Sequence, residues 1–340
     1  MQVFKIIVLL LFVFTDNAYA RVMPQQVAIV VNTNDAESQL IAEYYKIKRN
    51  IPKQNIIEIS MPSDRNAIDE KAFSHLFAQV KEQTPDVVQY YALAWSKPFK
   101  VKCMSITSAF AFGFNDAFCA KGCKSTRRSH YYDSDSAMPN QDLKIRPSMM
   151  LAGSSLQQVY DMIDRGVSAD GSMLKSKKAD ATAYLMSTTN KARNVRARRY
   201  DVIEELLSNN IKIEQLRSNV LEDKKDVMFY FTGLVKVEKI ESNDFLPGAI
   251  ADHLTSSGGQ LFNHNQMSIL RWLDAGVTAS YGTVVEPCAF TQKFPNPGIV
   301  IERYTNGESL IEAYWKSVAW PGQGIFVGEL MAAPYAEELK

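Results

Sequence analysis

The first hundred residues alternate between short β-branched runs and longer stretches with helical spacing, and no other feature limits the possible folds as strongly. Val27–Val31 and Val87–Ala94 are compact apolar runs typical of buried strands, and Asn55–Ser60 has a weaker strand pattern. The gaps between them repeat apolar residues at helical spacing, and Asn34 followed by Glu37 resembles a capping box that opens the first helix. Strand–helix–strand units at this pace predict an α/β fold, with a mainly parallel sheet and flanking helices.

A similar rhythm returns in the second part of the chain, so two α/β halves are expected, residues 21–166 and 179–340. The polar stretch Gly166–Lys178 is interpreted as an exposed linker between them. Residues 99–147 of the first half break the rhythm and are interpreted as a long insertion with little regular structure. Loops of this length are usually functional or mobile, so the insertion is a candidate lid. In the second half, strands are expected at 182–186, 211–216, 226–231 and 277–285, and helices at 195–207, 266–274 and 308–318.

The first twenty residues have the pattern of a secretory signal peptide. Lys5 precedes the apolar run Ile6–Phe14, and Ala18-Tyr19-Ala20 supplies small residues for cleavage near Ala20. The run is too short for a membrane span, which needs about twenty apolar residues, and no later stretch is long and apolar enough. The mature chain is therefore expected to be periplasmic or secreted, without a membrane span.

The charge of the chain is balanced, with a formal net charge of +1, so no general attraction to nucleic acid is expected. Four cysteines in an exported chain favour disulfides, and three pairings are open. Cys119 and Cys123 could close a small loop, which leaves Cys103 and Cys288 free or paired. No cofactor or metal is expected, because the only histidine near that loop is His130 and no Walker A pattern is present.

The candidate site lies where the predicted strands end, because ligands of open α/β sheets bind outside the carboxyl ends of the strands. The stretch Gly248–Gly259 forms one expected wall, and the end of the 277–285 run forms its neighbour. Four side chains at other strand ends or turns are candidate ligand-binding residues. They are Asn32, Asp35, Thr232 and Ser257.

Four residues of these two walls are candidate catalytic residues. Ser256 precedes two glycines and could be approached by backbone amides, and His253 could act as its base or as the base of Cys288. Glu286 could orient a histidine or bind a substrate cation. Strand alternation, however, puts His253 and Ser256 on opposite faces, and a disulfide competes with a nucleophilic role for Cys288.

Several segments together resemble an exported bacterial conserved hypothetical family of uncharacterised function. The resemblance covers nearly all of the mature chain and implies no reaction. It rests on Val31-Asn32, Ser38–Tyr45, Arg49–Pro52, Asn55–Ile57, Pro98, Met104–Thr107, Pro247–Ala251, His253, Ser256, Gly276–Gly282 and Glu286-Pro287.

The second half also resembles, distantly, the gingipain-type, caspase-like peptidase domain. In that family a strand ending in His-Gly and the next strand ending in Cys supply a catalytic dyad. The corresponding positions here are Phe231-Thr232-Gly233 and Leu254-Thr255-Ser256, which contain neither residue. The resemblance therefore implies the fold of such a peptidase without its dyad.

These observations favour an exported binding or scaffold protein on a caspase-like α/β fold. Its partner would be an unknown small molecule, a peptide or a component of the cell envelope. The alternative is a hydrolase that uses Ser256 or Cys288 with His253 and Glu286.

Overall fold

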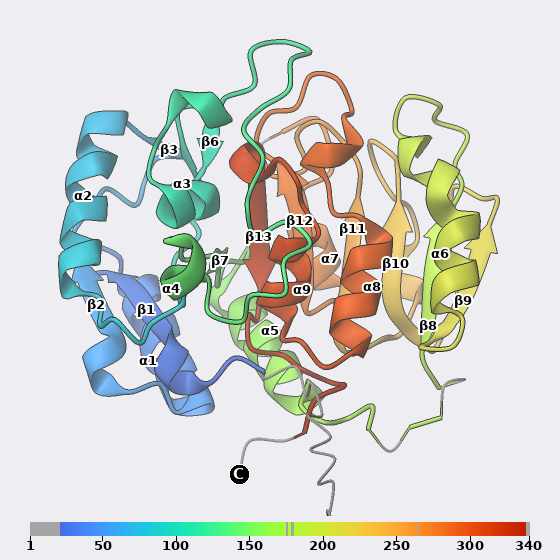
Figure 1. Ribbon diagram of the computed structural model, residues 1–340, viewed down its shortest axis with the longest axis horizontal. Helices are drawn as coiled ribbons and strands as arrows, with labels where there is room; N and C mark the ends of the chain where they lie inside the picture. The colour runs from blue at the N-terminus through green and yellow to red at the C-terminus, as the bar shows by residue number, and fades with distance from the viewer. Residues whose placement is uncertain (1–20, 175, 178–179, 263, 338–340) are drawn as a thin grey trace, which may run out of the picture.

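The computed structural model describes residues 21–337, except 175, 178–179 and 263, so the predicted signal peptide lies outside the described residues. A ten-stranded sheet with the order β2-β1-β4-β7-β13-β12-β11-β10-β8-β9 forms the centre of the protein (Figure 1). The strands of this sheet are β1 (Val27–Asn32), β2 (Ile56–Ile59), β4 (Tyr90–Leu93), β7 (Ser148–Met150), β8 (Thr182–Met186), β9 (Lys212–Leu216), β10 (Val227–Thr232), β11 (Phe245–His253), β12 (Ala279–Thr283) and β13 (Gly324–Gly328).

Helices cover both faces of the sheet, as expected for an α/β fold (Figure 1). One face carries α1, α5 and α7, and the other carries α2, α3, α6, α8 and α9. The helices are α1 (Ala36–Arg49), α2 (Glu70–Gln83), α3 (Ile106–Phe112), α4 (Pro139–Leu143), α5 (Leu156–Ala169), α6 (Tyr200–Leu207), α7 (Leu270–Asp274), α8 (Pro297–Thr305) and α9 (Leu310–Lys316). The predicted α/β class with a mainly parallel sheet is confirmed.

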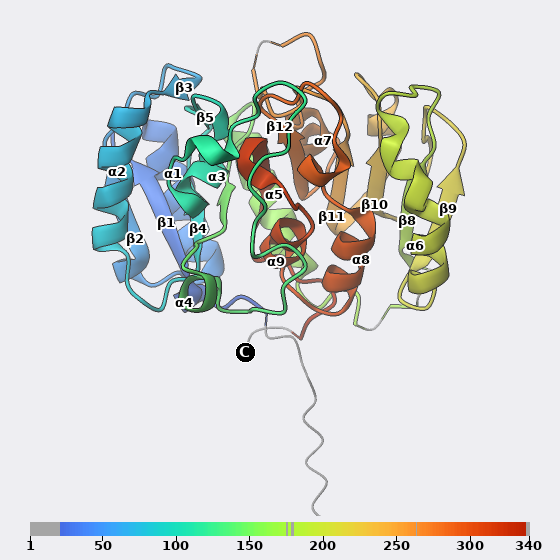
Figure 2. The same ribbon diagram turned by 45° about the horizontal axis from the view of Figure 1, so that its top comes forward.

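Strand β13 joins the two parts of the sheet and runs antiparallel to β12. It meets β7 through one residue pair with a parallel bonding pattern, Val327 and Met150, and a single pair does not set a strand direction. The contacts around this pair show how the two parts of the sheet are oriented. Ser105, which follows β4, donates to Gly324 O at the start of β13, and the Lys97 ammonium lies 4.6 Å from the ring centre of Phe262, which follows β11. The carboxyl ends of β4 and β11 therefore share one edge of the sheet, the upper edge in Figures 1 and 2.

The first helix begins one residue later than its sequence pattern indicates. The side chain of Asp35, not Asn34, caps α1 by accepting from the backbone amide of Glu37. Asn34 instead donates to the hydroxyl of Ser60, so the predicted capping box is wrong. Both Asn34 and Asp35 are suitable cap residues, and only the path of the chain decides between them.

The insertion between residues 99 and 147 has more regular structure than predicted. It contains α3, α4 and the strands β5 (Lys100–Val101) and β6 (Met104–Ser105), which form a small sheet with β3 (Ala67–Ile68). Its cysteines pair as Cys103–Cys119 and Cys123–Cys288, so of the three pairings that the sequence left open, the one with a small loop between Cys119 and Cys123 is not formed. The second disulfide ties the insertion to the turn after β12.

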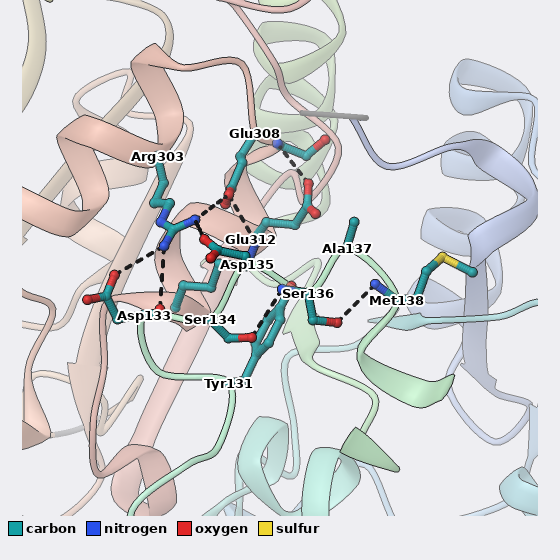
Figure 3. Close-up of polar contacts among 12 residues, drawn as sticks. Tyr131, Asp133, Ser134, Asp135, Ser136, Ala137, Met138, Arg303, Glu308 and Glu312 are labelled. Atoms are coloured by element: carbon teal, nitrogen blue, oxygen red, sulfur yellow. Dashed lines mark hydrogen bonds and ion pairs between the residues drawn. The ribbon is translucent and has the colours of Figure 1, made fainter. Parts of the chain in front are cut away.

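The end of the insertion, residues 126–138, lies across α9 and the neighbouring strands, and is called the strap here. The ring of its Tyr131 is buried, and the backbone amide of its Asp133 donates to Lys316 O. Figure 3 shows Arg303 of α8 between two strap carboxylates, at 3.2 Å from Asp133 and 2.8 Å from Asp135. The strap is thus held over the junction of the two parts of the sheet instead of being a loose lid.

Two features of the second half do not follow the predicted rhythm. Helix α8 and strand β13 have no counterpart among the predicted elements, and α5 extends to Ala169, into the stretch interpreted as an exposed linker. Gly166 is buried there, and its packing is so close that an added Cβ would lie 2.4 Å from the Cβ of Glu329. The division of the chain into halves at this stretch stays a prediction.

Candidate functional site

Strands β10 and β11 pair in parallel, and beyond a register shift after Val227 Thr232 lies opposite His253, so their carboxyl ends form one wall. The chain then turns through residues 254–259 and meets the end of β12, where the amide of Gly259 donates to Thr283 O at 3.0 Å. An added Cβ at Gly259 would lie 2.8 Å from Gly282 O, so this close approach requires glycine. The predicted neighbourhood of the two runs, Gly248–Gly259 and 277–285, is therefore present.

His253 lies at the end of β11 with only 1% of its surface exposed. Its Nδ1 accepts a hydrogen bond from Trp272 Nε1 at 3.0 Å, so Nε2 carries the proton and donates to Met267 O at 3.1 Å. Burial lowers the pKa of His253 to about 4. Both ring nitrogens are occupied, and the imidazole has no hydrogen bond to Ser256 or Glu286 among the described residues.

Glu286 follows β12 and is also buried, at 1% exposure. One carboxylate oxygen accepts from the amides of Cys288 and Ala289, and the other lies 3.2 Å from the Lys293 ammonium. The group therefore holds the turn after β12 and is neutralised by a buried cation. The same turn carries Cys288, whose sulfur is bonded to Cys123.

Thr255, which follows β11, is buried, and its hydroxyl group links two side chains beside the wall. Thr255 accepts from Arg193 Nε at 3.0 Å and donates to Gln266 Oε1 at 2.8 Å. The same oxygen of Gln266 accepts from the amide of Ser257 at 2.8 Å. Ser256 is half-exposed beside them, and only its backbone carbonyl makes a hydrogen bond among the described residues, to Thr283 Oγ1.

An ion pair behind this wall was missed by sequence reasoning. Arg196 Nη2 lies 2.6 Å from Asp252 Oδ1 and donates to Thr232 O at 2.6 Å, so one guanidinium contacts the ends of both β10 and β11. The Asp252 contact lacks hydrogen-bond geometry, which leaves both of its oxygens without a hydrogen-bond partner among the described residues. Burial raises the pKa of Asp252, and the charge of Arg196 opposes this rise. Alternation along β11, with Asp252 facing away from His253, was the available signal.

The two ligand candidates of the first half lie far along the sheet from this wall. The side chain of Asn32 is buried and bridges to the backbone of Met61 and Asn34. Asp35 caps α1. Thr232, the third ligand candidate, is buried, and its hydroxyl has no hydrogen-bond partner among the described residues.

The structure thus brings Ser256 and Ser257 to one surface, with Thr255 buried beneath them, and engages His253, Glu286 and Cys288 in structural contacts behind or beside it. Among residues 21–337 with their gaps, no group of three His, Cys, Asp or Glu side chains is arranged to hold a metal ion. The same part of the chain contains no helix long and apolar enough to cross a membrane.

Comparison with solved structures places this arrangement in a known fold. The crystal structure of the Arg-specific cysteine proteinase gingipain R matches 91% of this chain and 78% of its own, with a TM-score of 0.53 and 12% sequence identity. The chain shares the fold of gingipain R. A second structure, described as a protease, matches 92% of this chain and 79% of its own, with a TM-score of 0.47 and 9% identity.

The likeness to gingipain R confirms the predicted caspase-like α/β fold, and at this identity it extends to the fold alone. No protein-family model matches the sequence, and the search of curated proteins finds no match either. The resemblance to an exported hypothetical family therefore stays a prediction.

Proposed function

We propose that this is an exported binding protein, which uses a caspase-like fold without a His/Cys dyad to hold an anionic ligand at the surface formed by Arg193, Ser256 and Ser257, with the buried Thr255 holding Arg193 in place. One observation carries the proposal. The hydroxyl group of Thr255 links Arg193 to Gln266, which also accepts from the amide of Ser257, and among the described residues the hydroxyl groups of Thr255, Ser256 and Ser257 contact no titratable base. Such a surface offers hydrogen bonds and a positive charge, but no group that accepts a proton from a nucleophile.

The state of the other candidates supports binding over hydrolysis. A base must reach the proton that it removes, and the nitrogens of His253 are engaged by Trp272 and Met267. Cys288 has no thiol while it is bonded to Cys123. Arg193 uses Nε for Thr255, which leaves its two terminal nitrogens to pair with a carboxylate or phosphate.

The proposal is tested by native mass spectrometry of the protein after mild purification with its disulfides intact. We expect a retained anionic compound that is lost in Arg193→Met and kept in the matched variant Arg198→Met, which removes an exposed arginine of the neighbouring turn. A wild-type protein that retains no compound, or equal retention by both variants, contradicts the proposal.

A second measurement separates binding from the hydrolase alternative. The folded, oxidised protein is treated with a serine-directed fluorophosphonate and with a thiol-directed iodoacetamide probe. We expect no labelled residue, because neither an activated serine nor a free thiol is present. Labelling of Ser256 that disappears in His253→Ala would establish the hydrolase instead.

A further inference from the structure

Strand β2 ends the ten-stranded sheet and, among the described residues, pairs only with β1. The carbonyl of Ile59 faces β1, because it accepts from the amide of Thr33 at 2.8 Å. Backbone groups alternate in direction along a strand, so the N–H and C=O of Glu58 point away from the sheet. This edge therefore offers a donor and an acceptor to an added strand.

Two clefts lie on opposite sides of this edge. The α1 cleft, of about 240 Å³, lies between β2 and α1, and the α2 cleft, of about 330 Å³, lies between β2 and α2. Helices α1 and α2 cover opposite faces of the sheet, and Glu58 and Thr33 line both clefts. Successive side chains of a strand added beside β2 would point alternately to the two faces, and hence alternately into the two clefts.

The charges of the clefts indicate which side chains would fit. The α2 cleft is lined by Glu58 and Glu82 and by no lysine or arginine, and its other lining residues are polar or apolar; the carboxylate of Glu82 supplies its negative charge. The α1 cleft has a mixed lining, with Val31, Ala42 and Ile56 beside polar groups, and its one cation, Lys46, is paired with Glu43. A cationic side chain suits the α2 cleft, and a small apolar side chain suits the α1 cleft.

The opposite edge of the sheet, strand β9, differs from the β2 edge in the charges that it carries. Strand β9 carries Glu214 between two lysines, at 2.5 Å from Lys212 and 3.9 Å from Lys224. A charged strand of this kind protects a sheet edge against pairing, whereas the carboxylate in the α2 cleft has no such lysine among the lining residues of that cleft.

We propose that the β2 edge binds an extended peptide segment of a partner protein, in which a lysine or arginine enters the α2 cleft and a neighbouring small apolar side chain enters the α1 cleft. The backbone of the segment pairs with Glu58, and this pairing supplies affinity, while the two clefts supply specificity. The surface lies more than half the sheet away from the wall formed by β10 and β11, so the inference is independent of the ligand proposed there.

The test uses a fluorescein-labelled heptapeptide in which lysine and valine alternate, together with the same peptide carrying glutamate in place of lysine. Fluorescence anisotropy with the folded, disulfide-bonded protein is expected to show binding of the lysine peptide only. The double variant Glu58→Gln/Glu82→Gln is expected to weaken binding about five- to tenfold, because two exposed ion pairs are lost. The matched variant Glu205→Gln, on the exposed side of α6, is expected to bind like wild type.

Hydrogen exchange locates the contact independently of charge. The lysine peptide is expected to slow exchange of the outward-facing Glu58 amide and to leave the exposed strand β9 unchanged. Glu58→Pro removes that amide at a position where an edge strand tolerates proline, and it is expected to abolish binding. Absence of peptide binding to the wild-type protein, equal binding of both peptides, or unchanged exchange at Glu58 would each overturn the proposal, and none of these depends on whether the proline variant folds.

Discussion

Glu312 is a carboxyl group in the interior of the protein, and its surroundings favour the neutral form. One oxygen accepts from the amide of Ser309 at 3.1 Å, and the other lies 3.3 Å from the hydroxyl of Tyr90. Burial raises the pKa of Glu312 to about 7, the charge of Lys316 lowers it, and that of Glu308 raises it again. A group whose pKa is higher in the folded than in the unfolded chain stabilises the fold while it is protonated.

This gives a pH-dependent stability with a definite sign. The folded protein holds the proton of Glu312 up to a pH near 7, whereas the unfolded chain releases it near 4.5. The contribution is complete below the unfolded value and is lost as the pH rises through the folded value. In Glu312→Gln this loss is absent, so the variant should gain about 2 to 3 kcal/mol relative to wild type between pH 4 and pH 8.

Urea unfolding at several pH values measures that difference. Glu302→Gln, which changes an exposed carboxylate on the preceding helix, serves as the matched control and should follow the wild-type profile. A constant difference between Glu312→Gln and wild type across this range would show that the buried carboxyl does not titrate there.

The strap shows how one element depends on contacts from both sides. Beneath it, Arg303 and Lys316 contact the buried carboxylate of Glu308, at 3.3 and 3.0 Å. On its outer side Arg303 contacts Asp133 and Asp135, whose side chains are 51% and 86% exposed. The outer pairs are therefore screened by solvent and contribute little to global stability, although they fix where the strap lies.

Neutralising the outer pairs should loosen the strap without unfolding the protein. In Asp133→Asn/Asp135→Asn we expect trypsin to cleave faster after Arg127 and Arg128, which are exposed at the start of the strap. The free energy of unfolding should fall by less than about 1 kcal/mol. The control is Asp64→Asn, an exposed acid distant from the strap, and cleavage rates equal to wild type in the double variant would refute the role of these pairs.

The elements that the sequence predicted well are those with long periodic patterns. The runs at Val27 and Asp226 became β1 and β10 within a residue or two, because apolar periodicity reports burial directly. Strand β13 has five residues, of which the first and last are glycines, and gave no such signal. Disulfide partners depend on tertiary contacts, since Cys123 and Cys288 are separated by 165 residues.

In the candidate site, too, the positions along the strands were predicted and the tertiary contacts were not. The predicted strand ends placed the hydroxyl groups after β11 at the carboxyl edge of the sheet, because this placement needs only the positions and direction of the strands. Sequence alone did not reveal that Trp272 is hydrogen-bonded to His253 or that Lys293 is paired with Glu286, since these partners come from other turns of the chain. The buried pair of Arg196 and Asp252 escaped prediction for the same reason.

At the scale of the whole molecule, a buried ionic network joins the first part of the chain to its last strand. Arg49, the last residue of α1, contacts Glu329 just after β13 at 2.5 Å and Asp170 just after α5 at 2.5 Å. The hydroxyl of Tyr45 donates to the same glutamate at 2.6 Å. The side chains of Arg49 and Glu329 are 4% and 0% exposed, so neither charge has water as an alternative partner.

Removal of one charge from this network should therefore be more costly than removal of both. Arg49→Met leaves Glu329 buried without its main counter-ion, and we expect the free energy of unfolding to fall by about 3 to 5 kcal/mol. Arg49→Met/Glu329→Gln should recover part of that loss, because no unpaired carboxylate remains. Urea unfolding followed by tryptophan fluorescence and far-ultraviolet circular dichroism measures both variants. With Glu329→Gln measured as the second single variant, a double variant as unstable as the sum of the two single changes would mean that the two charges do not couple the beginning of the fold to its end.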